Sequence, residues 1–259
     1  MNPNRIQLGV DIGRLAGNGE LSRQEVAGIV RIALAALDNG ADYLKVPAEG
    51  SALLVNSLLS LAAPSLMLEG SLAAAERLVA GPQQPALFEL TDVNELGAAT
   101  GLCEAAMAAD MELVLSVTAP WKLPSERLPE GIVGLSLDAR PWATSSGAER
   151  ARHQQLIETA IAGAEDNELF VHLAYLPAAA DGEEAATLGG VAGIEMGTGL
   201  LPLLVDGGLA AGLAGLKRTL VDAQQGALAI ALEEHDHHHD HSHDHDHDHD
   251  HDAGCGCHH

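Results

Sequence analysis

The chain has 259 residues, a hydrophobic fraction of 47%, an aromatic fraction of only 2% and a formal net charge of −24 at pH 7. That length fits one large or two small domains, and a core so poor in aromatic rings must be built from aliphatic side chains. The acidity argues against nucleic acid or an anionic membrane as partner. Because there is no N-terminal signal pattern and no uninterrupted apolar run of membrane-spanning length, we expect a cytoplasmic protein.

Eight short apolar segments alternate with helical segments along the first 232 residues. After the first of them, Ser22 and Glu25 have capping-box spacing at the start of a helix. Such alternation is typical of parallel β-α units, and eight units of this total length predict a closed (β/α)8 barrel. An open doubly wound parallel sheet is the alternative. The expected strands are 6–12, 42–46, 66–69, 86–90, 112–117, 132–137, 169–176 and 191–196.

Helices and loops are expected to connect these strands. We expect the last helix to break at Gly207 and Gly208. Two stretches, 118–129 and 177–190, are expected to be loops because they are rich in Pro or Gly. We therefore predict an α/β domain over residues 1–232 and a disordered segment over residues 233–259. The expected helices are 22–39, 52–62, 72–79, 91–109, 148–164 and 200–232.

Nearly every expected strand carries a polar or ionisable residue near its C-terminal end. In a barrel these ends meet at one face, where active sites form, and an ionisable group in an apolar strand is costly without a partner. We therefore expect a shared polar site. A buried salt-bridge network, or outward-facing side chains after a one-residue shift in register, is the alternative. The catalytic candidates are Lys45, Glu69, Glu89, Asp138, His172 and Glu195.

Two chemistries fit these candidates. The carboxylates and His172 suit a divalent-metal site, whereas Lys45, among apolar neighbours, is expected to have a lowered pKa and to act as a base or Schiff-base nucleophile. Cations and a Gly-Thr-Gly turn in the following loops are expected to hold an anionic group of a small substrate, although the turn also fits a plain strand-to-helix connection. The substrate-binding candidates are Asp11, Arg14, Lys122, Arg140, Gly197 and Gly199.

The last 25 residues form a segment of unusual composition. It holds twelve of the fourteen histidines, seven aspartates and two of the three cysteines, with no Leu, Ile, Val or aromatic residue. Imidazole, carboxylate and thiolate are the main protein ligands for transition metals, so we expect it to bind Ni or Zn. The candidate metal ligands are His235, His237, His238, His239, His241, His243, His245, His247, His249, His251, Cys255, Cys257, His258 and His259.

In composition this segment resembles the His-rich termini of nickel accessory proteins, namely the urease and hydrogenase maturation chaperones and a nickel-handling prolyl isomerase. The resemblance covers only residues 233–259, and it implies metal storage or delivery, with a client metalloenzyme as partner. The alternatives are a barrel enzyme, such as an aldolase-like lyase or a metal-dependent isomerase or hydrolase, and a scaffold without chemistry.

Overall fold

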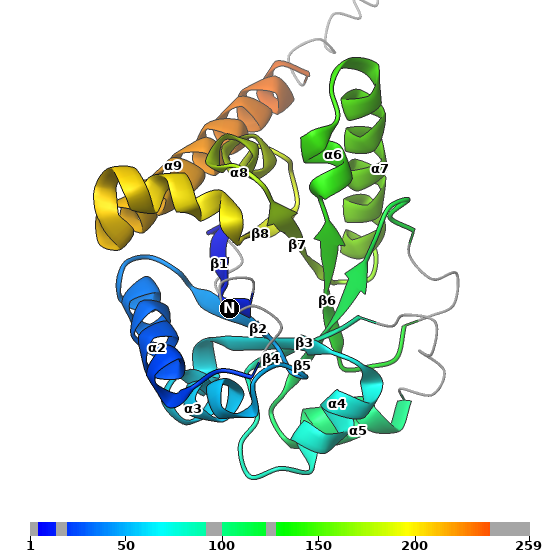
Figure 1. The fold of residues 1–259 in the computed structure, drawn as a ribbon. Coiled ribbons are helices and arrows are strands. Elements are labelled where there is room, and N and C mark those ends of the chain that lie inside the picture. Colours follow the sequence, from blue (N-terminus) through cyan, green and yellow to red (C-terminus); the bar gives the residue numbers. More distant parts are fainter. Residues whose placement is uncertain (1–4, 14–19, 92–99, 123–127, 239–259) are drawn as a thin grey trace, which may run out of the picture.

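The computed structural model describes residues 5–13, 20–91, 100–122 and 128–238, with only the backbone at 203–204, 206–207 and 234–238 (Figure 1). Within these ranges, eight parallel strands close into a barrel in sequence order. The predicted (β/α)8 barrel is confirmed, and the open sheet is wrong. The strands are β1 (Gln7–Asp11), β2 (Tyr43–Pro47), β3 (Leu66–Gly70), β4 (Leu87–Leu90), β5 (Glu112–Val117), β6 (Ile132–Asp138), β7 (Phe170–Leu176) and β8 (Val191–Met196).

Helices surround the barrel on its outer side (Figure 1). The capping box of α2 forms as expected: the Ser22 hydroxyl accepts from the Glu25 amide at 3.3 Å, and the Glu25 carboxylate accepts from the Ser22 amide at 2.8 Å. The α-helices are α2 (Arg23–Asp38), α3 (Ala52–Ala62), α4 (Leu72–Val79), α5 (Thr100–Ala108), α6 (Arg140–Thr144), α7 (Gly147–Glu165), α8 (Ala179–Ala186) and α9 (Leu201–His238). Two short 3₁₀ turns are η1 (Ala63–Ser65) and η3 (Thr198–Leu200).

Some helix predictions differ from the structure. Residues 177–190, expected to be a loop, contain α8. Gly182 of this helix is buried, and a Cβ added to it would lie 3.5 Å from side chains of β8 and α9. The local Gly and Asp content disfavours a helix here, and packing against the barrel outweighs that low helix propensity. The first part of the helix expected over 91–109 lies outside the described residues. The break expected in the last helix is present at Gly208, where φ is +74°.

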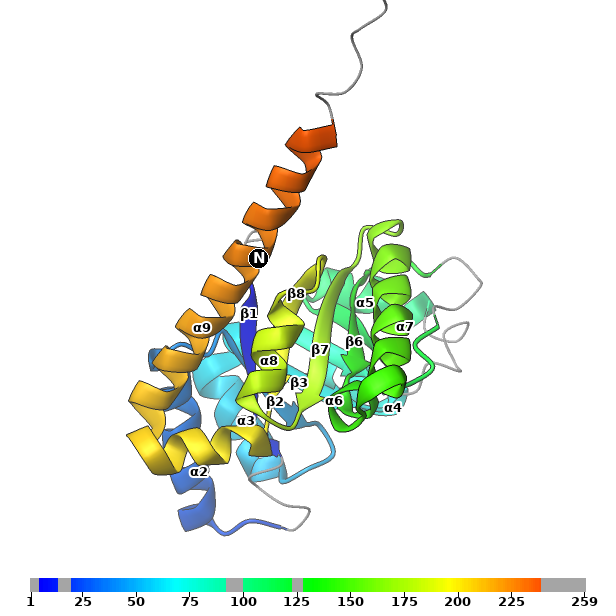
Figure 2. The same cartoon turned by 90° about the horizontal axis from the view of Figure 1, so that it is seen from above.

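The C-terminal helix α9 is anchored at the base of the barrel and then leaves it (Figure 2). Lys217 donates to the Ile6 carbonyl at 2.5 Å and pairs with Asp42, and Gln224 accepts from the Ile6 amide at 2.8 Å. The helix continues to His238, so the backbone at 233–238, expected to be disordered, is helical. Across the described ranges, no helix is both long and apolar enough to span a membrane.

Inside the barrel, side chains from alternate strands stack in layers. Near the base the filling is apolar, with Tyr43, Met67, Leu87 and Val114 in one cluster. The strand pairings place the next even-strand layer toward the C-terminal face, and that layer is polar. Its four members come from β2, β4, β6 and β8 and are Lys45, Glu89, Ser136 and Glu195.

Candidate active site

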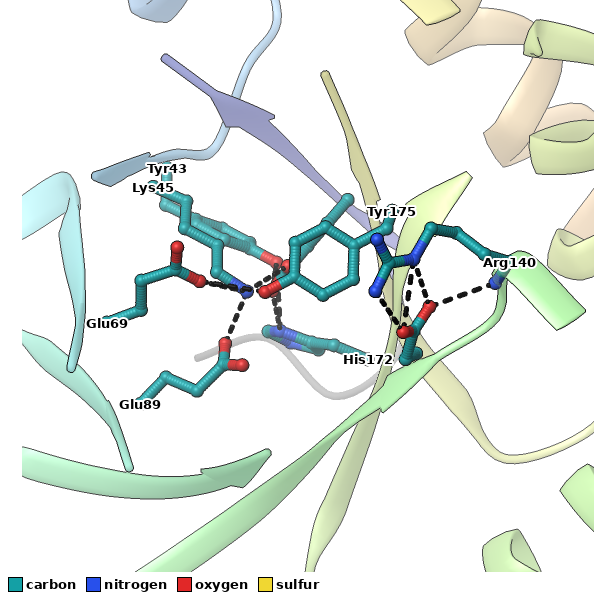
Figure 3. A network of polar contacts seen from close by, with 9 residues as sticks. Tyr43, Lys45, Glu69, Glu89, Arg140, His172 and Tyr175 are labelled. Carbon is teal, nitrogen blue, oxygen red and sulfur yellow. Dashed lines mark hydrogen bonds and ion pairs between the residues drawn. The ribbon is translucent and has the colours of Figure 1, made fainter. Parts of the chain in front are cut away.

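Lys45 stands at the centre of the polar layer and is fully buried. Its Nζ lies 2.5 Å from Oε2 of Glu89 and 2.8 Å from Oε2 of Glu195, which are both buried as well. Oε2 of Glu69, from the layer above, is 3.3 Å away. One ammonium therefore holds three carboxylates from three other strands, and Figure 3 shows those of Glu69 and Glu89 beside it. Strand register brings together residues that are up to 150 positions apart in the sequence.

Tyr43 and His172 support the cluster from below. The Tyr43 hydroxyl donates to Oε1 of Glu195 at 2.9 Å and lies 2.9 Å from Nδ1 of His172. The two rings stack, with centroids 5.3 Å apart. Glycines make room for both rings: a Cβ on Gly9 would lie 2.4 Å from Cζ of Tyr43, and one on Gly193 would lie 2.6 Å from Cδ2 of His172. Glu195 is thus fixed at both of its oxygens.

Tyr175 and Glu69 lie at the outer edge of the cluster, where both are partly exposed. The Tyr175 hydroxyl donates to Oε2 of Glu69 at 2.8 Å, and its ring centroid lies 4.5 Å from Nζ of Lys45. On the other side of the ring, the guanidinium carbon of Arg140 is 4.9 Å from the centroid. Tyr175 therefore lies between the two cations in Figure 3.

Asp138 and Arg140 form a separate pair at the rim. The Arg140 side chain contacts both carboxylate oxygens of Asp138, with Nε at 2.8 Å from Oδ1 and 3.1 Å from Oδ2 and with Nη2 on Oδ2. The Arg140 amide also donates to Oδ1 at 3.1 Å. Trp121 donates to the Asp138 carbonyl at 3.1 Å. Because Asp138 already binds the guanidinium, Arg140 is less suited to an anionic substrate than expected.

The two buried carboxylates that share the Lys45 ammonium, those of Glu89 and Glu195, have different pKa values. Burial raises the pKa of Glu89 to about 7, against the attraction of Lys45. Burial would also raise the pKa of Glu195, but the Lys45 charge and the contact with His172 outweigh it and lower that pKa to about 2. Near neutral pH, Glu89 can therefore take up or release a proton while Glu195 stays ionised.

The structure corrects the pKa expected for Lys45. Burial by itself would lower the pKa, as the sequence suggested, but Glu195, Glu89 and Glu69 outweigh burial and raise the pKa well above its ordinary value. Tyr43, which is also buried, has a raised pKa chiefly because of burial. Lys45 is thus a permanent cation and not the free amine that a Schiff base requires.

The divalent-metal site expected from the same residues is not formed. Within the described ranges no group of three or more His, Cys, Asp or Glu side chains is arranged to hold a metal ion. The physical reason is that the Lys45 ammonium occupies the position where the three glutamates converge. Most of the tail ligands, from His239 onward, lie outside the described residues, so the tail prediction is untouched by this result.

The remaining predicted site residues lie at different places. Asp11 is buried at the end of β1, paired in register with Lys45 of β2. Arg14 lies outside the described residues, and Lys122 is exposed after β5. Gly197 precedes the 3₁₀ turn η3 and Gly199 lies within it, and a Cβ on Gly199 would lie 2.6 Å from the Pro177 carbonyl oxygen. At Gly199, close packing against a carbonyl accounts for the missing side chain without a bound anion.

Three buried polar atoms in and beside the cluster lack a hydrogen-bond partner among the described residues: Oε1 of Glu89, Oγ of Ser136 and Nε2 of His172. Such atoms are costly in a barrel interior and are typical of functional sites. Sequence reasoning missed Ser136, Tyr43 and Tyr175. The sequence could have indicated Tyr43, because residues two apart on a strand face the same side and Tyr43 precedes Lys45 by two.

Comparison with known proteins adds the fold alone. No family model matches the chain, and no curated protein matches it either. Solved structures, by contrast, match the chain in their fold. The chain is a (β/α)8 barrel of the TIM type. At sequence identities this low, the likeness says nothing about activity.

Three similar structures illustrate the match. The 3-hexulose-6-phosphate synthase from Salmonella typhimurium has 14% identity and a TM-score of 0.55, covering 86% of this chain and 100% of that one. The tryptophan synthase subunit alpha from Legionella pneumophila has 12% identity and a TM-score of 0.53, covering 86% and 93%. The 7,8-dihydropteroate synthase from Vibrio fischeri has 10% identity and a TM-score of 0.54, covering 90% and 95%.

Proposed function

We propose that the barrel is an enzyme that transfers a proton on a small carbonyl-bearing substrate, as an isomerase or lyase does. The observation that carries this proposal is the Lys45 cluster: a buried permanent cation beside Glu89, whose pKa of about 7 suits acid–base work at neutral pH. Glu195 contacts the same ammonium but has a lowered pKa, so that it stays ionised while Glu89 gains or loses a proton.

The proposed roles follow from the contacts. Glu89 takes a proton from the carbon beside the substrate carbonyl and later returns it. Lys45 stabilises the negative charge that develops on the carbonyl oxygen, without giving up its own proton. Glu195, held by Tyr43 at 2.9 Å, fixes the ammonium in place. Thus the carboxylate moves the proton and the ammonium stays charged throughout.

One further point bears on this proposal. An anionic group on the substrate, expected from Arg14, Lys122 and Arg140, has weaker support, because Arg140 is bound by Asp138.

Deuterium exchange tests the proposal with a panel of small carbonyl compounds. Hydroxyketones, aldehydes and oxo acids are each incubated with the protein in D₂O, and incorporation at carbon is followed by NMR. Glu89→Gln should slow the exchange about 10²–10⁴-fold. Glu112→Gln, at an exposed position at the start of β5, is the matched control. Exchange that is undiminished in Glu89→Gln would contradict the assignment.

We also propose that the His/Asp/Cys-rich tail binds Ni or Zn, for storage or for delivery to a client metalloenzyme. The density of ligands in residues 235–259 supports this second function. In Figure 2 the C-terminal part of α9 leads away from the barrel, which is compatible with a metal site that works independently of the barrel interior. Calorimetric titration with Ni or Zn, with and without residues 235–259, tests this second function.

A further inference from the structure

Tyr175 stands between Lys45 and solvent. The Lys45 side chain has no exposed surface, while Glu69, its outermost carboxylate partner, is 19% exposed. The Tyr175 ring lies over the Lys45 ammonium at 4.5 Å, and the hydroxyl is bound to Glu69 at 2.8 Å. A substrate that approaches Lys45 from the C-terminal face therefore meets the ring of Tyr175.

The position of Tyr175 depends on an irregularity in β7. In the pairing of β7 with β8, Leu173 matches Ile194 and Leu176 matches Met196, so β7 uses three residues where β8 uses two. In a regular strand, Tyr175 would point to the side opposite His172. The extra residue turns the ring inward, and Tyr175 takes a φ of +61°, which is unfavourable for a bulky side chain. Such irregularities often re-aim a side chain beside an active site.

The contacts of Tyr175 are of a kind that can be exchanged. They include one hydrogen bond to a partly exposed carboxylate and cation–π contacts to Lys45 and Arg140. A ligand with a hydroxyl group or a protonated amine can replace the hydrogen bond at Glu69. A carboxylate group cannot, because it is ionised and has no proton to donate to Glu69 at neutral pH.

We propose that Tyr175 is a movable cap on Lys45, and that the substrate displaces it by donating its own hydrogen bond to Glu69. The cap follows from contacts of the free protein, whereas the donor group assigned to the substrate rests on the proposed function of the cluster. Tyr175 is thus a specificity-determining residue, which favours substrates with a hydroxyl or amine at the position of its own hydroxyl.

Lysine acetylation tests the cap in the absence of substrate. The chain has only three lysines: Lys45 under the cap, Lys217 buried at the base, and Lys122 exposed. Each is followed by mass spectrometry after treatment with N-hydroxysuccinimide acetate. The variants are Tyr175→Gly, which removes the ring and accepts the positive φ, and Tyr175→Phe, which keeps the ring and loses only the hydroxyl.

Acetylation requires the free amine, and the raised pKa makes that form of Lys45 rare in the wild type and in the variants alike. The test therefore compares the rate of Lys45 between the proteins and not with the rate of Lys122. In Tyr175→Gly, the reaction of Lys45 should accelerate at least about tenfold while that of Lys217 stays constant, and Tyr175→Phe should lie between the two. If Lys217 also accelerates, opening is general, and the same comparison is made with Tyr175→Asn, whose side chain tolerates positive φ. An unchanged rate at Lys45 after removal of the ring would overturn the cap.

A rescue experiment tests the donor group. p-Cresol, which has the structure of the missing side chain, should slow the acetylation of Lys45 again in Tyr175→Gly, and acetate, which is ionised and has no proton to donate, should not. Protection by acetate alone would refute a donor at Glu69. Failure of either acetylation result leaves deuterium exchange by Glu89 unaffected, so the cap and the proposed reaction can be judged separately.

Discussion

The Lys45 ammonium lies 2.5 Å from a carboxylate oxygen of Glu89, although the two residues belong to strands β2 and β4 and are 44 positions apart. Neither residue is exposed. This contact places a permanent cation against a carboxyl group whose pKa is about 7. The stability and the chemistry of the barrel interior therefore depend on the same pair.

Replacement of Lys45 should strongly destabilise the fold. Lys45→Met leaves the carboxylates of Glu89 and Glu195 buried without a counter-charge, and removal of one partner from a buried ion pair costs about 3–5 kcal/mol. Urea unfolding at neutral pH measures the loss. Lys122→Met, at an exposed position, is the control and should change stability by less than about 0.5 kcal/mol. A Lys45→Met variant as stable as the control would mean that the cluster is protonated or hydrated and not ion-paired.

Glu89 should make stability fall as the pH rises toward neutrality. Its pKa is raised from 4.5 to about 7 in the fold, so its contribution is complete below pH 4.5 and is lost as the pH rises through 7. Glu195 behaves oppositely: its pKa is lowered from 4.5 to about 2, so its contribution is present above pH 4.5 and lost as the pH falls toward 2. Urea unfolding across this range should show a smaller decline between pH 4.5 and 7 in Glu89→Gln than in wild type. Equal slopes in the two proteins would disprove the raised pKa.

Loss of the Tyr43 hydroxyl should weaken the cluster without removing a charge. Tyr43→Phe leaves Oε1 of Glu195 without its 2.9 Å donor and His172 without its neighbour at Nδ1. A buried acceptor left unsatisfied costs about 1–3 kcal/mol, measured by urea unfolding. If deuterium exchange is observed, it should slow in the same variant, because Glu195 no longer fixes Lys45 as firmly. A variant that loses stability but exchanges at the wild-type rate would limit Tyr43 to a structural role.

Gly9 should not tolerate a methyl group. In Gly9→Ala the new Cβ would lie 2.4 Å from Cζ of Tyr43, and overpacking of this kind costs about 1–3 kcal/mol. Gly28→Ala is the matched control: no atom lies within 4 Å of its Cβ position, and Ala in a helix interior is favoured over Gly by about 0.5–1 kcal/mol. The midpoint of thermal unfolding should therefore fall in Gly9→Ala and rise in Gly28→Ala. A Gly9→Ala variant that is as stable as the wild type or more stable would show that the Tyr43 ring can move aside.

Deletion of residues 235–259 should remove most bound Ni or Zn and leave the thermal transition of the barrel in place. The two residues that anchor α9 to Ile6, Lys217 and Gln224, lie well before the deletion. Calorimetric titration of both proteins measures the stoichiometry, and binding by the full chain should weaken as the pH falls through about 6.5. A full-length variant with the tail histidines replaced by asparagine controls for length and acidity. Equal metal stoichiometry in all three proteins would rule out a metal-binding tail.

The sequence by itself determined much of the fold. The bounds expected for four elements, 52–62, 72–79, 112–117 and 191–196, coincide with α3, α4, β5 and β8. These predictions succeeded because apolar periodicity and capping serines are local signals. The closed barrel was predicted for the same reason, since eight β-α units were countable along the chain. The polar strand-end residues were also visible, because an ionisable side chain stands out in an apolar strand.

Only the tertiary structure decided what those residues do together. The sequence suggested a metal site or a lysine with a lowered pKa, and the fold instead places Lys45 among Glu69, Glu89 and Glu195, where its charge is held. The inward turn of Tyr175 depends on one extra residue in the pairing of β7 with β8. Pairing across a barrel joins segments far apart in the chain, and both pKa values and cap contacts depend on distances of a few ångströms between them. No pattern within a single strand contains that information.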